Sequence, residues 1–246
     1  MSALVLALIA GAVIGLALGA LGGGSVLAVP ALIYLLGFTP AAATTASLII
    51  VAATSATALY AHARDGHVAW KAGSLFAAAG IIPAYVTGAA SSHVPEAALT
   101  IAFAVIAALA AVRMFRPSAS EPAGRTRPGK AAGAGAGLGA VTGFLGAGGG
   151  FLAVPALVSV LGLTMRRAVG TSLLVITVNS LAALTARAGS GGGLDWALIG
   201  PFTGAAILGA WDGKRLSAKV SGNSLQKVFA GVLLAAAVFM LIDVIA

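Results

Sequence analysis

The chain has 246 residues, of which 60% are hydrophobic and 8% are charged, and it contains no cysteine. Soluble domains carry about 25% charged residues, so this composition excludes a soluble globular protein and indicates an all-α polytopic membrane protein in a lipid bilayer. The lack of thiols excludes disulfides and iron–sulfur clusters. The net charge of +8 lies in short loops between apolar runs, which is typical of topology signals and argues against nucleic acid as a partner.

The first half, residues 1–115, opens with a long apolar stretch, residues 3–37, that three consecutive glycines interrupt at 22–24. Its beginning lacks a charged segment, so we expect it to belong to the bundle and not to a signal peptide. An unbroken helix of this length would extend about 50 Å, well beyond a hydrocarbon core of about 30 Å, so the chain is expected to turn back at the glycines. Three membrane-spanning helices are then predicted at residues 40–60, 70–90 and 97–115.

A polar linker, residues 116–132, separates the first half from a second transmembrane repeat, residues 133–246. Pairing Pro30 with Pro155 gives an offset of 125 residues, under which residues 27–32 and 152–157 are identical. The same offset pairs further identical residues over most of both halves: Gly37 with Gly162, Ser47 with Ser172, Ser55 with Ser180, and Gly88 with Gly213. The chain therefore contains an internal duplication.

Positive charge predicts how the halves lie in the membrane. If each glycine-broken stretch is a hairpin that returns to its starting side, 13 of the 14 Lys and Arg residues lie in loops on one side, and only Arg187 lies on the other. If each stretch crossed once, the split would be 8 against 6. The positive-inside rule favours the hairpins. A hairpin and three transmembrane helices make an odd number of crossings, so the predicted fold is two inverted-topology repeats with both termini outside.

The glycine breaks are the predicted binding site. Short helices are expected to begin near Ser25 and Gly150, where free amide N–H groups and the positive end of the helix dipole would face the middle of the membrane. Glycine allows close approach to such amides, so the expected ligand is a small inorganic or organic anion. The predicted substrate-binding residues are Gly23, Gly24, Ser25, Thr45, Ser47, Gly148, Gly149, Gly150, Thr171, Ser172 and Asn179.

Other polar and small residues are expected to have simpler roles. The spaced glycines at 11, 15 and 19 and at 135, 139 and 143 are typical of close helix packing, and Gly135→Ala is expected to be mild. Asn179 suits either the site or a bond between helices, and both readings stay open. His62, His67 and His93 are expected to be solvated loop residues. The sequence shows no nucleophile or metal cluster, so we predict no enzyme, no catalytic residue, no metal and no cofactor.

At these motifs the sequence resembles the TauE/SafE family of sulfite exporters. The resemblance rests on two glycine-rich breaks, each followed by Val-Pro-Ala-Leu, and on Gly-Thr-Ser-Leu at residues 170–173. The first copy departs from the pattern, because it is one residue shorter and has Ser25 in place of a glycine. The resemblance implies a secondary transporter that exports sulfite or an organosulfonate across the bacterial inner membrane. An anion channel, a carrier of small carboxylates, and a homo-oligomer stay open as alternatives.

Overall fold

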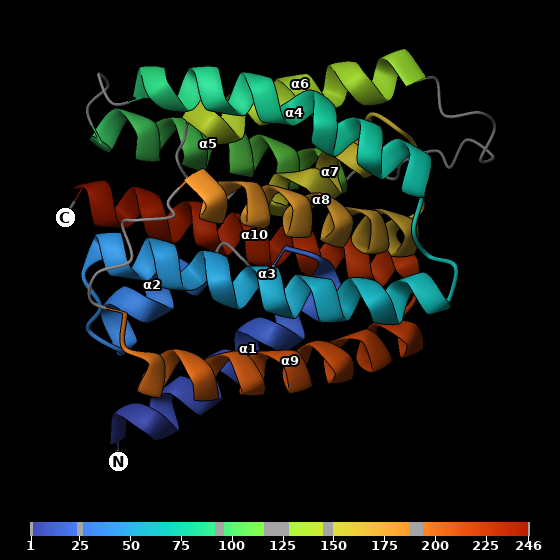
Figure 1. Cartoon of the computed structure of the whole chain (residues 1–246). Coiled ribbons are helices and arrows are strands. Elements are labelled where there is room, and N and C mark those ends of the chain that lie inside the picture. Colours follow the sequence, from blue (N-terminus) through green and yellow to red (C-terminus); the bar gives the residue numbers. More distant parts are fainter. Residues whose placement is uncertain are drawn as a thin grey trace.

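A computed structural model describes residues 2–23, 27–91, 96–115, 128–144, 150–186 and 194–245, and within these residues the regular structure is helical (Figure 1). The first half contains α1 (Ser2–Leu21), α2 (Ala28–Pro30) with a π-helical continuation η2 (Ala31–Leu35), α3 (Pro40–Arg64), α4 (Trp70–Ser91) and α5 (Glu96–Phe115). The second half contains α6 (Pro128–Phe144), α7 (Gly150–Ser159), α8 (Met165–Ala186), α9 (Trp196–Lys219) and α10 (Gly222–Ile245).

The three helices predicted after the first break are confirmed as α3, α4 and α5, although α3 continues four residues beyond the expected end. Thr39 begins α3 as its N-cap, with its side chain accepting from the Ala42 amide at 3.4 Å and Pro40 at the first helical position. α6 begins at Pro128, inside the residues assigned to the linker, because proline suits the first turn of a helix.

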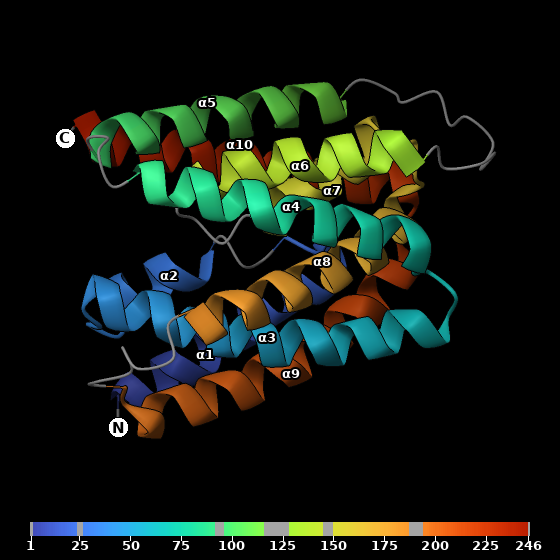
Figure 2. The same cartoon turned by 45° about the horizontal axis from the view of Figure 1, so that its top comes forward.

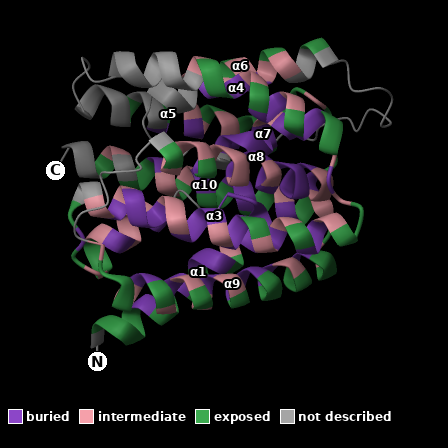
Figure 3. Ribbon diagram, in the orientation of Figure 1, coloured by how far each residue is buried: buried purple, intermediate pink, exposed green. Residues whose placement is uncertain are grey.

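Large apolar side chains cover the outside of the bundle, as a lipid-facing surface requires. Ile82 on α4 is 74% exposed and Leu208 on α9 is 70% exposed. Figure 3 shows exposed residues along the outer faces of α3 and α9 and buried residues on their inner faces. Within the described residues, four helical segments are long and apolar enough to cross a membrane: Ala3–Leu21, Ala42–Arg64, Met165–Thr185 and Gly222–Phe239.

The internal duplication recurs as a repeated turn. Gly37, after η2, and Gly162, after α7, are equivalent under the 125-residue offset, and both have positive φ, at 70° and 64°. Glycine adopts this left-handed conformation without steric cost, which explains why both copies carry it. The hydrogen bonds of the two turns also correspond, since Phe38 N donates to Leu32 O and Leu163 N donates to Leu157 O, each at 3.1 Å.

The main helix pairs each join a helix of one half to a helix of the other. α1 packs along α9 and α6 packs along α4, while α3 pairs with α8 and α5 with α10 (Figure 2). Each of the first two pairings joins the opening helix of one half to the penultimate helix of the other. The core follows the same division: one buried cluster joins α1, α2 and α3 to α9, and another joins α4 and α5 to α7 and α10.

The pairing of α1 with α9 and of α6 with α4 depends on the spaced glycines. A Cβ at Gly11, Gly15 or Gly19 would overlap the backbone of α9, and a Cβ at Gly135 or Gly139 would overlap that of α4. The predicted packing role is therefore confirmed for these five glycines. The expectation that Gly135→Ala is mild is wrong, because the added methyl group would meet the rigid Phe76 carbonyl and not a movable side chain.

Several connections between helices gather at one end of the bundle, here called the connection end. Arg166 at the start of α8 donates from Nη2 to Ala218 O at 3.0 Å, and Gln226 on α10 donates from Nε2 to Met114 O on α5 at 2.7 Å. Lys214 on α9 pairs with Asp65, directly after α3, at 2.7 Å. α1 begins and α10 ends at the opposite end (Figure 1). The loops predicted to share one side of the membrane, residues 61–71, 113–130, 164–167 and 212–227, therefore contribute residues to the same end.

Candidate functional site

The first glycine break lies against the second half of the chain. Gly22 has a φ of 70°, and a Cβ placed on it would lie 2.5 Å from Ser172 Oγ, 3.2 Å from Val154 Cγ2 and 3.3 Å from Val169 Cα. The Ser172 hydroxyl donates to Val169 O at 2.8 Å and lies 3.4 Å from Gly22 O. The chain therefore turns at Gly22 in a space that only glycine fits, between α7 and α8.

The second break begins a short helix where the sequence predicts one. α7 starts at Gly150, and its residues from Leu152 to Val158 are buried apart from Ala156, which is half-buried. The described part of this helix therefore lies inside the protein. Gly23 is buried directly after Gly22. Gly24, Ser25, Gly148 and Gly149 lie outside the described residues.

Thr171 has a structural partner. It is fully buried, and its Oγ1 accepts a hydrogen bond from the Ala69 amide at 3.0 Å. Beside it, a Cβ at Gly170 would lie 2.5 Å from His67 O. The Gly-Thr pair thus holds the α3–α4 connection against α8, which is a role that the sequence reading did not assign to it.

Thr45 and Ser47 are buried in the first turns of α3, and Ser47 Oγ donates to Thr44 O at 2.8 Å. α3 ends at the connection end, whereas α8 begins there. Ser47 lies eight residues from Ser55, and Ser172 lies five residues from the Thr177 that Ser55 contacts, in the opposite direction along the bundle. At 1.5 Å per residue, Ser47 and Ser172 are therefore separated by roughly 20 Å along the bundle. The structure does not bring the predicted hydroxyl groups of the two halves to a single point; it places them on opposite sides of the middle.

A polar contact between α3 and α8 lies between these two positions. Thr177 Oγ1 and Ser55 Oγ form a hydrogen bond of 2.9 Å. Next to it, Thr54 is 1% exposed, and its Oγ1 has no hydrogen-bond partner among the described residues. Asn179 is half-buried and lies two residues beyond Thr177 on α8, so it points from a different side of this helix. Sequence reasoning missed Thr54 and Ser55 as site candidates, although the offset pairs them with Asn179 and Ser180.

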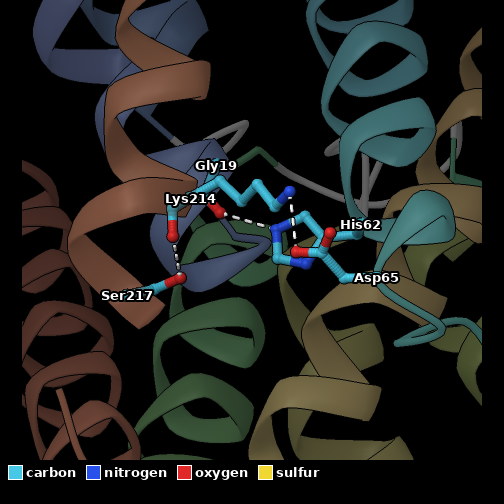
Figure 4. Close-up of polar contacts among 5 residues, drawn as sticks. All are labelled: Gly19, His62, Asp65, Lys214 and Ser217. Carbon is cyan, nitrogen blue, oxygen red and sulfur yellow. Dashed lines mark hydrogen bonds and ion pairs between the residues drawn. The ribbon is translucent and has the colours of Figure 1, made fainter. Parts of the chain in front are cut away.

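His62 is not a solvated loop residue, so that prediction is wrong. It lies in the last turn of α3, is 4% exposed, and its Nε2 is 3.1 Å from Gly19 O (Figure 4). The extra turn of α3 beyond residue 60 carries the ring into the interior, against the end of α1. Figure 4 also shows Lys214 reaching from α9 past this ring to Asp65. The nearby Lys214 ammonium lowers the pKa of Asp65, mainly by hydrogen bonding to its carboxylate.

Within the described residues, no group of His, Asp and Glu is arranged to hold a metal ion. The polar groups of the candidate site are hydroxyls, amides and backbone. These are neutral donors that can bind an anion without chemical change to it.

Comparison with known proteins identifies the family of the chain. The family model described as sulfite exporter TauE/SafE matches residues 7–240. A probable membrane transporter protein of Xylella fastidiosa strain 9a5c is 32% identical over 241 residues, which cover 94% of this chain and 92% of the relative. A protein of the same description from strain Temecula1 is 31% identical over 242 residues, with the same coverage. No solved structure matches the chain. The chain therefore belongs to the TauE/SafE sulfite exporter family, a family of membrane transporters and not of enzymes.

Proposed function

We propose that the protein is a secondary transporter that exports a small sulfur-containing anion, such as sulfite or an organosulfonate, across the bacterial inner membrane. The observation that carries the proposal is the position of the first glycine break, where Gly22 turns between Val154 on α7 and Ser172 on α8. A broken helix enclosed by protein at membrane depth is the usual construction of a transporter binding site. Membership of the TauE/SafE family supports the sulfur anion as the substrate.

The two halves are proposed to be inverted-topology repeats. Three features support this: the exchanged pairings of α1 with α9 and of α6 with α4, the corresponding turns at Gly37 and Gly162, and the connections shared at one end. The excess of Lys and Arg at the connection end supports a cytoplasmic position for this end, with both termini outside. Rocking of the packed cluster of α1, α2, α3 and α9 against the cluster of α4, α5, α7 and α10 would then expose the site to each side in turn.

The substrate is proposed to bind near the middle of the membrane, between the two breaks. The donors proposed are the amides at the start of α7 and the hydroxyl groups along the α3–α8 contact, and half-buried Asn179 on α8 is a further candidate. The hydroxyls of Ser47 and Ser172 lie on either side of this contact. We propose that each hydroxyl binds the anion at a different stage of its passage across the membrane, and that the two do not bind it at the same time.

Transport by the purified protein in lipid vesicles tests the proposal. Sulfite, thiosulfate, sulfoacetate and acetate would be supplied separately, and uptake would be followed against external concentration. We expect saturable flux of the sulfur anions, with acetate poorly transported. Non-saturating flux would identify an anion channel, and preference for acetate would identify a carboxylate carrier.

The substitution Gly150→Val tests whether the anion binds at the start of α7. A side chain at the start of α7 would block close approach of an anion to the free amides there. Loss of one good hydrogen bond to a charged ligand weakens binding by about ten- to a hundredfold. Gly137→Ala, which faces open space on α6, serves as the control. Full uptake by Gly150→Val would place the site elsewhere.

A further inference from the structure

A small cavity lies at the connection end, where α1, α3, α8, α9 and α10 meet. Its volume is about 20 Å³, which is space for a single water-sized group. Its polar lining comes from His62, Asp65, His67, Arg166, Lys214 and Ser217. The side chains of Lys214 and Asp65 are 22% and 44% exposed, so the cavity reaches the protein surface on their side.

His62 lines this cavity, and one of its ring nitrogens has no hydrogen-bond partner among the described residues. A carbonyl oxygen can only accept, so the bond between His62 Nε2 and Gly19 O places a hydrogen on Nε2 (Figure 4). In the neutral imidazole, Nδ1 then carries a lone pair, and it becomes a donor only when the ring is protonated. Nδ1 is buried and has no hydrogen-bond partner among the described residues.

Arg166 supplies the second unpartnered group. Its Nη2 is held by Ala218 O at 3.0 Å and by Val220 O at 3.2 Å. Its Nε is buried and, like His62 Nδ1, has no hydrogen-bond partner within the described part of the chain. A guanidinium stays charged at any physiological pH, so this N–H is a permanent donor. Leaving such groups buried and unpaired is unfavourable, which favours a ligand that satisfies both.

The charges around the cavity favour an anion. Asp65 and Lys214 form an ion pair of 2.7 Å and largely cancel each other. His67, from the α3–α4 connection, has its ring 6.2 Å from that of His62. α1 and α10 line the cavity only with apolar residues, Ala20 and Leu225. Arg166 is therefore the charged group of this lining without a carboxylate partner, and protonation of His62 would add a second positive charge.

We propose that this cavity is a proton-linked site for one oxygen of a small oxyanion. The anion accepts hydrogen bonds from Arg166 Nε and from protonated His62 Nδ1, so one proton from the cytoplasmic solution binds with each anion. The site adjoins the first glycine break, since Gly19 lies one turn before Gly22 and Val169 lines the cavity and also contacts Gly22. The inference rests on the proposed transport of sulfur anions and adds the group that couples their binding to protons.

Isothermal titration calorimetry of the purified protein tests this site. Sulfate and methanesulfonate are suitable probes because their own charge is constant between about pH 5 and 8, where histidine titrates. We expect affinity to fall by up to about tenfold per pH unit in the upper part of this range. Titrations in buffers of different ionisation enthalpy should show up to one proton taken up per anion.

Substitutions distinguish the role of His62 from that of Arg166. His62→Gln keeps an amide that can donate to Gly19 O but removes the titrating nitrogen, so proton uptake and pH dependence should disappear. Arg166→Gln should weaken binding by about ten- to a hundredfold and leave the proton uptake of the remaining binding unchanged. His67→Gln is the matched control, because it changes a neighbouring, more exposed histidine and should preserve the proton count. Thermal unfolding would check that each variant folds.

The outcomes distinguish this site from the transport function. If the wild-type protein binds and transports the anions without taking up protons, or if His62→Gln keeps the proton uptake, the proton-linked site is wrong and transport still stands. If no sulfur anion binds or is transported at any pH, both proposals fail. Should His62→Gln not fold, the proton count of the wild type and of His67→Gln decides the question alone.

Discussion

Gly22 and Ser172 are 150 residues apart in sequence, yet the Ser172 hydroxyl lies 3.4 Å from the Gly22 carbonyl oxygen. This contact joins the first glycine break to α8 of the other half. The space where a side chain of residue 22 would lie is also filled, since a Cβ at Gly22 would lie 2.5 Å from Ser172 Oγ.

Gly22→Ala should be strongly destabilising. Its positive φ costs an L-residue about 1–2 kcal/mol, and overpacking against α7 and α8 adds about 1–3 kcal/mol. Gly37→Ala is the control, because Gly37 has the same φ of 70° with no atom within 4 Å of the added Cβ. Unfolding in mild detergent would compare the two. Equal losses would mean that α7 and α8 do not crowd Gly22, and Ser172→Ala in the Gly22→Ala background should recover part of the stability.

Gly135→Ala should prevent close pairing of α6 with α4, because the methyl group would overlap the Phe76 carbonyl. We expect a loss of at least about 2 kcal/mol. Gly137→Ala, two residues further along α6 and facing open space, should instead stabilise by up to about 1 kcal/mol through helix propensity. Melting temperatures measured side by side test the difference. A neutral Gly135→Ala would contradict the close approach of these helices.

Thr171→Val should loosen the α3–α4 connection. The substitution keeps the shape of the side chain but removes the acceptor for the Ala69 amide, and an unpaired buried N–H costs about 1–3 kcal/mol. Thr171→Ser keeps the oxygen and should lose much less. Amide hydrogen exchange at residues 66–70 would report the effect locally. Unchanged exchange in Thr171→Val would show that this bond does not hold the connection.

Topology can be tested by single cysteines, because the natural chain has none. Lys219→Cys and Gly129→Cys, at exposed positions, should react with a membrane-impermeant thiol reagent only from the cytoplasmic side. Thr185→Cys, near the end of α8, should react only from outside. Reaction of Lys219→Cys from outside would invert the proposed orientation.

The ion pair between Asp65 and Lys214 should make a small contribution to stability that acid removes. Lys214 lowers the pKa of Asp65 in the folded protein, so the contribution is present above the ordinary pKa of the carboxyl and is lost as the pH falls through the lowered value. Because the pair is partly exposed, we expect less than about 1 kcal/mol. The unfolding temperatures of wild type and Asp65→Asn should differ near neutral pH and converge below about pH 4. A constant difference across this range would assign the effect to packing.

The sequence by itself determined the helical membrane fold, the two glycine breaks and the duplicated Val-Pro-Ala-Leu motifs. It also predicted which loops share one end of the bundle, because charge and hydropathy act locally and can be read without knowing any partner. The start of α7 at Gly150 follows in the same way, since a run of consecutive glycines disfavours helix before it.

Only the tertiary structure decided which polar residues meet. It placed His62 against Gly19 and Thr171 on the α3–α4 connection, and it separated Ser47 from Ser172 along antiparallel helices. It also made Gly135 crowded and Gly137 free, although both belong to one glycine-rich helix. The physical reason is that burial and hydrogen bonding depend on which helices pack together, and α1 with α9 or α3 with α8 are pairings of segments more than a hundred residues apart.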